Sequence, residues 1–104
     1  MLAENTMKLL ANPLRIAILT WLKQPDVAFA NYHQLYPYEQ YGVCASLIQD
    51  KAELSQPAIS LCLKSLSELG VIEAQKVGKW TYYRRNEVKI QEIVESITQQ
   101  LHQL

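Results

Sequence analysis

The segment from Leu54 to Gly70, LSQPAISLCLKSLSELG, constrains the fold more than any other part of the chain. At about 100° of rotation per residue it forms one apolar side and one polar side, which predicts an α-helix. Ser55 is suited to cap the helix N-terminus, Pro57 to occupy its first turn, and Gly70 to end it in a left-handed conformation. The side predicted to face the core consists of Ile59, Cys62, Leu63, Leu66 and Leu69.

The opposite side of this helix carries short polar groups, one leucine and one cation. A single exposed leucine is common and by itself indicates only a surface helix. The same set of side chains, however, is what a helix needs to contact base edges in the major groove of DNA. Gln56 can pair with adenine, and Ser60 can bond to several bases. Leu61 can contact a thymine methyl group, and Lys64 can reach guanine or phosphate.

The segments on either side of this helix extend the pattern. Helical spacing also occurs from residue 44 and stops at residues 53–55, so a helix-turn-helix is predicted over about residues 44–70. After the helix, VIEAQKVGKWTYYRR places Gly78-Lys79 between two runs rich in β-branched and aromatic residues. This second pattern predicts a two-stranded β-hairpin over about residues 71–85.

Charge is distributed unevenly along the chain although its total is zero. Ten lysines and arginines balance ten aspartates and glutamates, so the net charge alone does not indicate a polyanionic partner. Residues 71–90, however, hold five cations and two anions, and cations in a hairpin beside a DNA-reading helix would contact phosphates. The residues predicted to contact DNA are Ser55, Gln56, Ala58, Ser60, Leu61, Lys64, Lys76, Lys79, Arg84 and Arg85.

Further helices are predicted at both ends of the chain. Asn12 and Pro13 separate two apolar blocks, because asparagine caps helices and proline is accepted in a first turn. This division predicts helices over about residues 3–11 and 13–24. The final helix, about residues 87–103, repeats apolar residues at steps of four and three, which is the narrow seam of a helix packed against one partner helix.

The composition describes one small globular domain over residues 1–104. Hydrophobic residues make up 49% and charged residues 19% of the chain, which is typical of a globular protein. No apolar run reaches eighteen residues and no secretory leader precedes the first helix, so a cytoplasmic protein with no membrane partner is expected. Neither a phosphate-binding glycine loop nor a nucleophile motif occurs, so the chain is not predicted to be an enzyme.

Three stretches, LLANPLRIAIL, LSQPAISLCLKSLSELGVI and VGKWTYYR, resemble the ArsR/SmtB-type winged-helix transcriptional regulators of bacteria over most of the chain. The resemblance implies a mainly α-helical winged helix-turn-helix fold with a small two-stranded β wing. It also implies a homodimeric repressor that binds an imperfect palindrome in double-stranded DNA, with the first and last helices at the dimer interface. The interface residues that it implies are Met7, Leu10, Ile90, Val94, Ile97 and Leu101.

The sequence departs from the family pattern within the helix-turn-helix. Leu61 and Cys62 occupy positions where relatives commonly have two histidines, so different preferred bases are expected. Glu53 stands where relatives often have a turn glycine, which predicts a small strain if this residue must be left-handed.

The metal sites common in the family are incomplete in this chain. A thiolate pair at the start of the first helix of the motif would need a second cysteine near Cys44, but Gly42 stands two residues before it. The last helix offers three glutamates and only His102, which do not complete the carboxylate and histidine site. No metal and no cofactor is therefore predicted.

The sequence leaves three alternatives open. Cys44, near a predicted helix N-terminus, is a candidate redox-sensitive thiol. Residues 25–43 form a long connection that is either a hydrophobic flap or the wall of a pocket for an unidentified organic effector. A winged-helix domain can also bind protein instead of DNA, because fold does not fix function. The aromatic residues of the connection are Phe29, Tyr32, Tyr36, Tyr38 and Tyr41.

Overall fold

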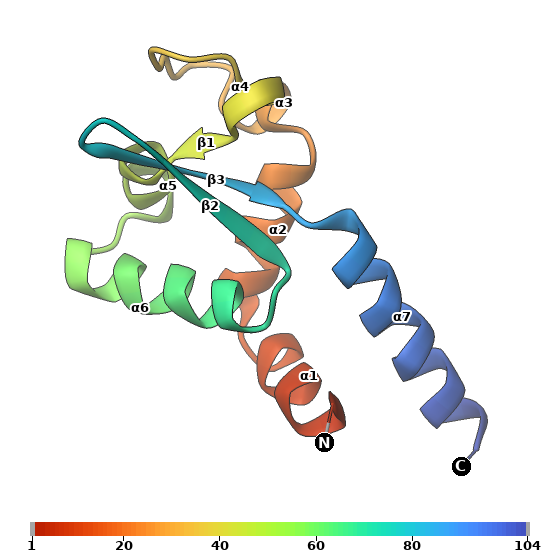
Figure 1. The fold of residues 1–104 in the computed structure, drawn as a ribbon. Helices are drawn as coiled ribbons and strands as arrows, with labels where there is room; N and C mark the ends of the chain where they lie inside the picture. Colours follow the sequence, from red (N-terminus) through yellow and green to blue (C-terminus); the bar gives the residue numbers. More distant parts are fainter. Residues whose placement is uncertain (1, 104) are drawn as a thin grey trace.

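The computed structural model describes residues 2–103. The chain is mostly helical, with one small antiparallel sheet of three strands in the order β1-β3-β2 (Figure 1). The elements in chain order are α1 (Leu2–Leu10), α2 (Pro13–Lys23), α3 (Pro25–Ala28), α4 (Tyr38–Tyr41), β1 (Val43–Cys44), α5 (Ala45–Ala52), α6 (Gln56–Glu68), β2 (Ile72–Val77), β3 (Trp80–Arg85) and α7 (Glu87–His102).

The molecule is elongated, measuring 47 × 26 × 23 Å. The first turn of α6 and the tip of the β2–β3 hairpin project on one side, at the left of Figure 1. We call this hairpin, residues 72–85, the wing. The helices α1 and α7 pack against each other and extend away from the wing tip toward the lower right of Figure 1. The first turn of α6 and the wing tip therefore lie at one end of the protein and α7 extends toward the other, while the last turn of α6 lies beside α1.

The predicted helix starts are confirmed in atomic detail. The side chain of Asn12 accepts hydrogen bonds from the backbone N–H groups of Leu14 (3.0 Å) and Arg15 (3.2 Å), which caps α2. Ser55 Oγ accepts from the N–H of Ala58 at 3.3 Å and caps α6. Each cap satisfies N–H groups that have no partner within the helix. The helix-turn-helix therefore begins its second helix one residue after the serine, as the sequence indicates.

The core lies where α2, α5 and α6 meet the sheet. Ile18, Ile48 and Leu66 are completely buried there, and Phe29 and Tyr82 are almost so. The apolar side predicted for α6 is confirmed, because Ile59, Cys62, Leu63 and Leu66 are all buried and Leu69 packs partly against them. Burying each large aliphatic side chain contributes about 1.5–3 kcal/mol to folding, so this face fixes the orientation of α6.

The predicted two-stranded wing forms as β2 and β3, but the sheet contains a third strand that the sequence did not predict. Val43 and Cys44 form β1, which pairs antiparallel with Tyr83 and Tyr82 of β3. Gly42 precedes this strand with a φ of 86° and a ψ of −159°, a region essentially reserved for glycine. A strand of two residues is too short to show an alternating pattern, so only its pairing with β3 identifies it.

The connection over residues 25–43 is a packed flap that contains the short helices α3 and α4. Phe29 is its buried centre, with its ring edge-on to Trp21 at 6.3 Å and to Tyr32 at 5.5 Å between centroids. Gln34 ties the flap to β1. Its Nε2 donates to the carbonyl oxygens of Tyr36 and Gly42, both at 2.8 Å, and its Oε1 accepts from the N–H of Cys44 at 2.8 Å.

Glu53 adopts the left-handed conformation that was expected because the resembled family often has a turn glycine at this position. Its φ of 56° and ψ of 42° end α5, and its N–H donates to the carbonyl of Asp50 at 3.1 Å. A residue with a Cβ atom costs about 1–2 kcal/mol in this region. The turn between α5 and α6 therefore carries backbone strain that a glycine would not.

Replacing Glu53 with glycine is expected to raise the free energy of unfolding by about 0.5–1 kcal/mol. The change removes the strain, and the greater freedom of glycine in the unfolded chain offsets part of the gain. Denaturant unfolding followed by circular dichroism measures the difference. Glu53→Ala is the control, because it removes the same charge but keeps the Cβ atom. An equal gain from both variants would assign the effect to charge instead of backbone strain.

Candidate nucleic-acid interface

The outward side of α6 presents the side chains that the sequence analysis singled out. Gln56, Ser60 and Lys64 are all exposed, and Leu61 is 68% exposed. Ser55 is also exposed, while Ala58 is half-buried. Because the opposite face is held in the core, this set of residues cannot turn inward without breaking the packing of α6.

A groove of about 580 Å³ runs between α6, the start of α5 and the wing. We call it the α6–wing groove. Its walls bring together Gln56, Ser60 and Lys64 from α6 with Lys79 from the wing, although fifteen or more residues separate Lys79 from the helix residues. The walls also include six residues that the sequence analysis did not identify: Ala45, Ser46 and Gln49 from α5, and Trp80, Thr81 and Tyr83 from β3.

The four predicted wing cations occupy different environments. Lys79 lies at the exposed turn and lines the groove. Lys76 is exposed and directly opposite Thr81 in the strand register, and paired residues share a face of a ribbon. Because Thr81 lines the groove, Lys76 lies on the same face of the wing as the groove. Arg84 is exposed but opposite Glu73, near the base of the wing.

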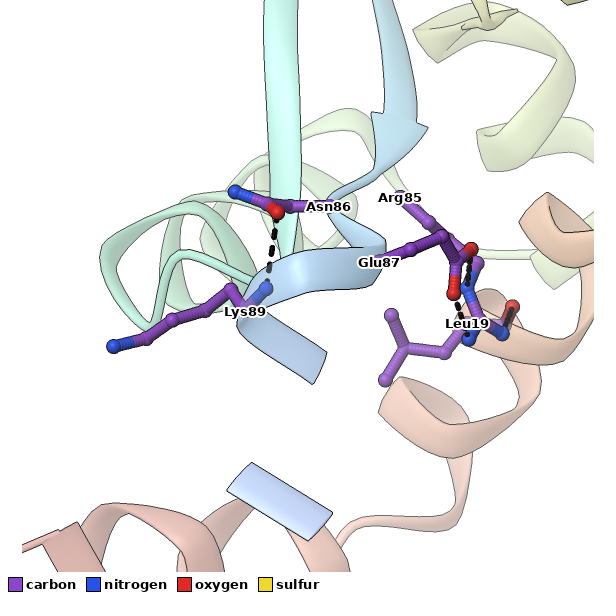
Figure 2. A network of polar contacts seen from close by, with 5 residues as sticks. All are labelled: Leu19, Arg85, Asn86, Glu87 and Lys89. Atoms are coloured by element: carbon purple, nitrogen blue, oxygen red, sulfur yellow. Dashed lines mark hydrogen bonds and ion pairs between the residues drawn. The ribbon is translucent and has the colours of Figure 1, made fainter. Parts of the chain in front are cut away.

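Arg85 has a structural role at the base of the wing (Figure 2). Its guanidinium binds the Glu87 carboxylate through Nε at 2.8 Å and Nη2 at 2.9 Å, and Nη1 donates to the carbonyl of Leu19 at 3.1 Å. Next to it, the side chain of Asn86 caps α7 by accepting from the N–H of Lys89 at 3.0 Å. Arg85 therefore fastens the wing to α2 and α7 and is not available as a groove cation. The pattern of charges could not separate it from Arg84.

Both thiols belong to the interior. Cys44, the candidate redox residue, is only 5% exposed, and its Sγ is 3.2 Å from Ser46 Oγ. Cys62 lies in the core, where burial raises the pKa of its thiol and outweighs the opposing effect of Arg15. A raised pKa keeps a thiol protonated and weakly reactive. In the part of the chain that the structure describes, no three histidine, cysteine, aspartate or glutamate side chains gather as a metal site would require.

The terminal helices leave apolar side chains uncovered at the other end of the protein. Met7 and Leu10 on α1 are exposed, as are Val94 (47%) and Leu101 (59%) on α7. The other two predicted interface residues differ: Ile90 and Ile97 are half-buried and pack against the core of their own protomer. The seam seen in the sequence therefore divides into an inward pair and an outward pair.

Comparison with known proteins places this geometry in a family. No family model matches the chain. The chain is 43% identical over 83 residues to the uncharacterized HTH-type transcriptional regulator YbzH of Bacillus subtilis (strain 168), covering 80% of this chain and 82% of that protein. The chain belongs to the HTH-type transcriptional regulators. The uncharacterized HTH-type transcriptional regulator MJ1325 of Methanocaldococcus jannaschii is 30% identical over 59 residues, 57% of this chain and 66% of that protein.

In this HTH-type regulator, α5 and α6 are the two helices of the motif and α6 is the second, outward-facing one. The wing follows it directly and supplies the opposite wall of the groove. None of the helices described is long and apolar enough to cross a membrane. The α6–wing groove is therefore the candidate functional site, and its distinguishing feature is the convergence of polar α6 side chains with a wing lysine.

Proposed function

We propose that this HTH-type regulator is a homodimeric repressor of the ArsR type that binds an imperfect palindrome in duplex DNA. The observation that carries the proposal is the α6–wing groove, which gathers Gln56, Ser60, Lys64 and Lys79 at one surface. In this arrangement α6 enters the major groove and reads base edges, while the wing follows the adjacent backbone. The glutamine and serine supply specificity, and the two lysines supply phosphate contacts.

The homodimer is supported by the exposed apolar side chains of α1 and α7. Met7, Leu10, Val94 and Leu101 are four exposed large apolar residues on two helices that pack together. A second copy related by a two-fold axis would cover all four, because such an interface pairs the same patch on both protomers. In Figure 1 the wing tip and the first turn of α6 lie away from α1 and α7, so a dimer formed through the terminal helices would leave the start of each α6 exposed, one for each half-site of a palindrome.

The proposal is tested by measuring affinity for a duplex selected from a randomised DNA library. We expect the protein to enrich a two-fold symmetric sequence and to bind it with an affinity that falls steeply as salt rises, because phosphate contacts release counterions. Absence of enrichment together with salt-independent binding would favour the alternative of a protein-binding module. Reporter expression from a promoter that carries the selected sequence then distinguishes repression from activation.

Lys79→Glu is expected to weaken binding to all DNA sequences by about tenfold and to reduce the slope of log affinity against log salt by about one. The reason is that a phosphate-neutralising cation at the wing turn becomes an anion. Lys23→Glu makes the same charge change at the end of α2, outside the groove lining, and we expect it to leave the affinity close to that of the parent. Equal loss in both variants would mean that overall charge, not the wing, controls binding.

Gln56→Ala provides a second comparison within the groove. An amide that pairs with a base contributes to the discrimination of that base, so its removal should relax the selected sequence at one position in each half-site. We expect the salt slope to stay unchanged, since no cation is lost. The two variants together therefore separate base reading by α6 from backbone binding by the wing.

A further inference from the structure

A second hollow, of about 220 Å³, lies between the flap and the wing. We call it the flap hollow. Its walls come from residues 33–35 of the flap, from the junction of β1 with α5, and from β3, so it exists only because the long connection folds back beside the sheet. The side chains that define its character are His33, Leu35, Ser46, Leu47, Trp80 and Tyr82.

The lining of the flap hollow is largely apolar. Among the described residues around it there is no aspartate, glutamate, lysine or arginine, whereas the α6–wing groove contains Lys64 and Lys79. Leu35 and Trp80 stand at its edge with 77% and 48% of their surface exposed. Ser46 and His33 add a hydroxyl and an imidazole as hydrogen-bonding groups. This combination of apolar walls and a few polar groups is typical of sites for small organic molecules.

The size of the hollow limits its ligand. A cavity of about 150 Å³ accommodates benzene, so 220 Å³ suits a molecule of one or two aromatic rings. The lack of charged walls disfavours an ionic ligand, since an unpaired charge is costly to bury. A neutral planar molecule could lie against Trp80 and Tyr82 and cover Leu35, and one hydroxyl or N–H group on it could bond to Ser46 or His33.

The flap hollow and the α6–wing groove share three lining residues. Cys44, Ser46 and Trp80 belong to the walls of both. Trp80 begins β3, next to Lys79 at the wing turn, and Ser46 lies in the first turn of α5. A ligand in the flap hollow that displaced Trp80 or Ser46 would therefore change the distance between the wing and the helix-turn-helix. The same backbone is tied to the flap by the hydrogen bond from the Cys44 N–H to Gln34.

We propose that the flap hollow is an effector site for a neutral one- or two-ring aromatic molecule, and that its occupation weakens DNA binding by displacing Trp80 and the start of α5. The second half of this statement rests on the DNA-binding function proposed above. Coupling between two sites requires a ligand to prefer one state of the shared element, and the wall formed by Cys44, Ser46 and Trp80 is that element here.

Binding is tested first without DNA, with fluoroindole and fluorophenol as probes in fluorine NMR. We expect saturable binding of at least one probe, with backbone amide shifts concentrated at Leu35, Ser46 and Trp80 in the protein spectrum. Leu35→Ala should lower the probe affinity at least about fivefold because it removes an apolar wall. Val27→Ala is the matched control, since Val27 on α3 is also highly exposed, at 68%, but does not line the hollow. No saturable binding, or equal loss in both variants, would overturn the site.

The regulatory half is tested by titrating DNA in the presence of the bound probe. We expect saturating probe to lower DNA affinity at least about fivefold, the lower range of ordinary allosteric coupling, and expect this effect to shrink in Leu35→Ala. Unchanged DNA affinity with a filled site would refute the coupling. If the protein fails to bind DNA in the absence of any probe while the probe still binds, the proposed function fails and the ligand site stands.

Discussion

Replacing Gly42 with alanine is expected to lower the free energy of unfolding by about 3 kcal/mol or more. Its backbone, with φ at 86° and ψ at −159°, lies in a region that residues with a Cβ atom almost never adopt, which costs about 1–3 kcal/mol. An added Cβ would also overlap the carbonyl oxygen of Tyr83 and lie 2.6 Å from its carbonyl carbon, and backbone cannot move aside as a side chain can. Urea unfolding followed by circular dichroism measures the loss.

Gly78→Ala is the matched control for this prediction. Gly78 also has a positive φ, 62°, but a Cβ placed there meets no atom within 4 Å. It should therefore cost only the backbone strain, about 1 kcal/mol. If the two variants lose the same stability, the close approach of Gly42 to β3 is not what the fold depends on. A small domain has only about 5–15 kcal/mol of stability in total, so the larger loss is a considerable fraction of it and should lower the urea midpoint clearly.

The parts of the fold that were predictable from sequence are those specified by local chemistry. The start of α6 depends on Ser55, Pro57 and an apolar repeat that all lie within one segment, so the helix and its buried side could be read directly. The wing turn at Gly78-Lys79 was equally local. The left-handed turn at Glu53 was indicated only by the resemblance to the ArsR-type regulators, which often have glycine at this position.

The features that were missed depend on contacts between distant segments. The strand β1 is defined only by its pairing with β3, about 40 residues later in the chain. Arg85 resembles the other wing cations in sequence. Its side chain is nevertheless held at the base of the wing by Glu87 and by a backbone carbonyl of α2. Neither the β1–β3 pairing nor the contacts of Arg85 can be predicted from composition or residue spacing. The length and aromatic content of the flap mark it as unusual in the sequence, yet its attachment through Gln34 and the hollow beside Trp80 arise only when the chain folds back on the sheet.

The apolar seam of α7 combines residues that pack within the protomer and residues that stay exposed. Apolar residues that repeat at steps of four and three form a narrow apolar stripe on one side of a helix. The sequence analysis predicted that this stripe packs against one partner helix. In the structure Ile90 and Ile97 face their own protomer, while Val94 and Leu101 remain exposed. The outward pair is therefore the part of the seam that still needs an explanation, and the homodimer proposed above would provide one.

The double variant Val94→Glu, Leu101→Glu is expected to sediment as a monomer and to bind the selected palindrome at least about 100-fold more weakly than the parent. Both side chains are exposed in the single protomer, so the changes should preserve its fold and its circular dichroism spectrum. In a dimer, four glutamates would be buried without partners across the two-fold axis, which is prohibitive. A monomer then loses the gain in effective concentration that two linked half-site contacts provide.

Val88→Glu separates this effect from a general effect of negative charge on α7. Val88 is on the same helix and is also exposed, but six residues before Val94 it lies about 120° away around the axis. We expect it to sediment and bind DNA like the parent. Should the double variant remain dimeric, the terminal helices are not the interface. Should it become monomeric and still bind the palindrome with parental affinity, each α6 acts alone, and the requirement for two symmetric half-sites is removed.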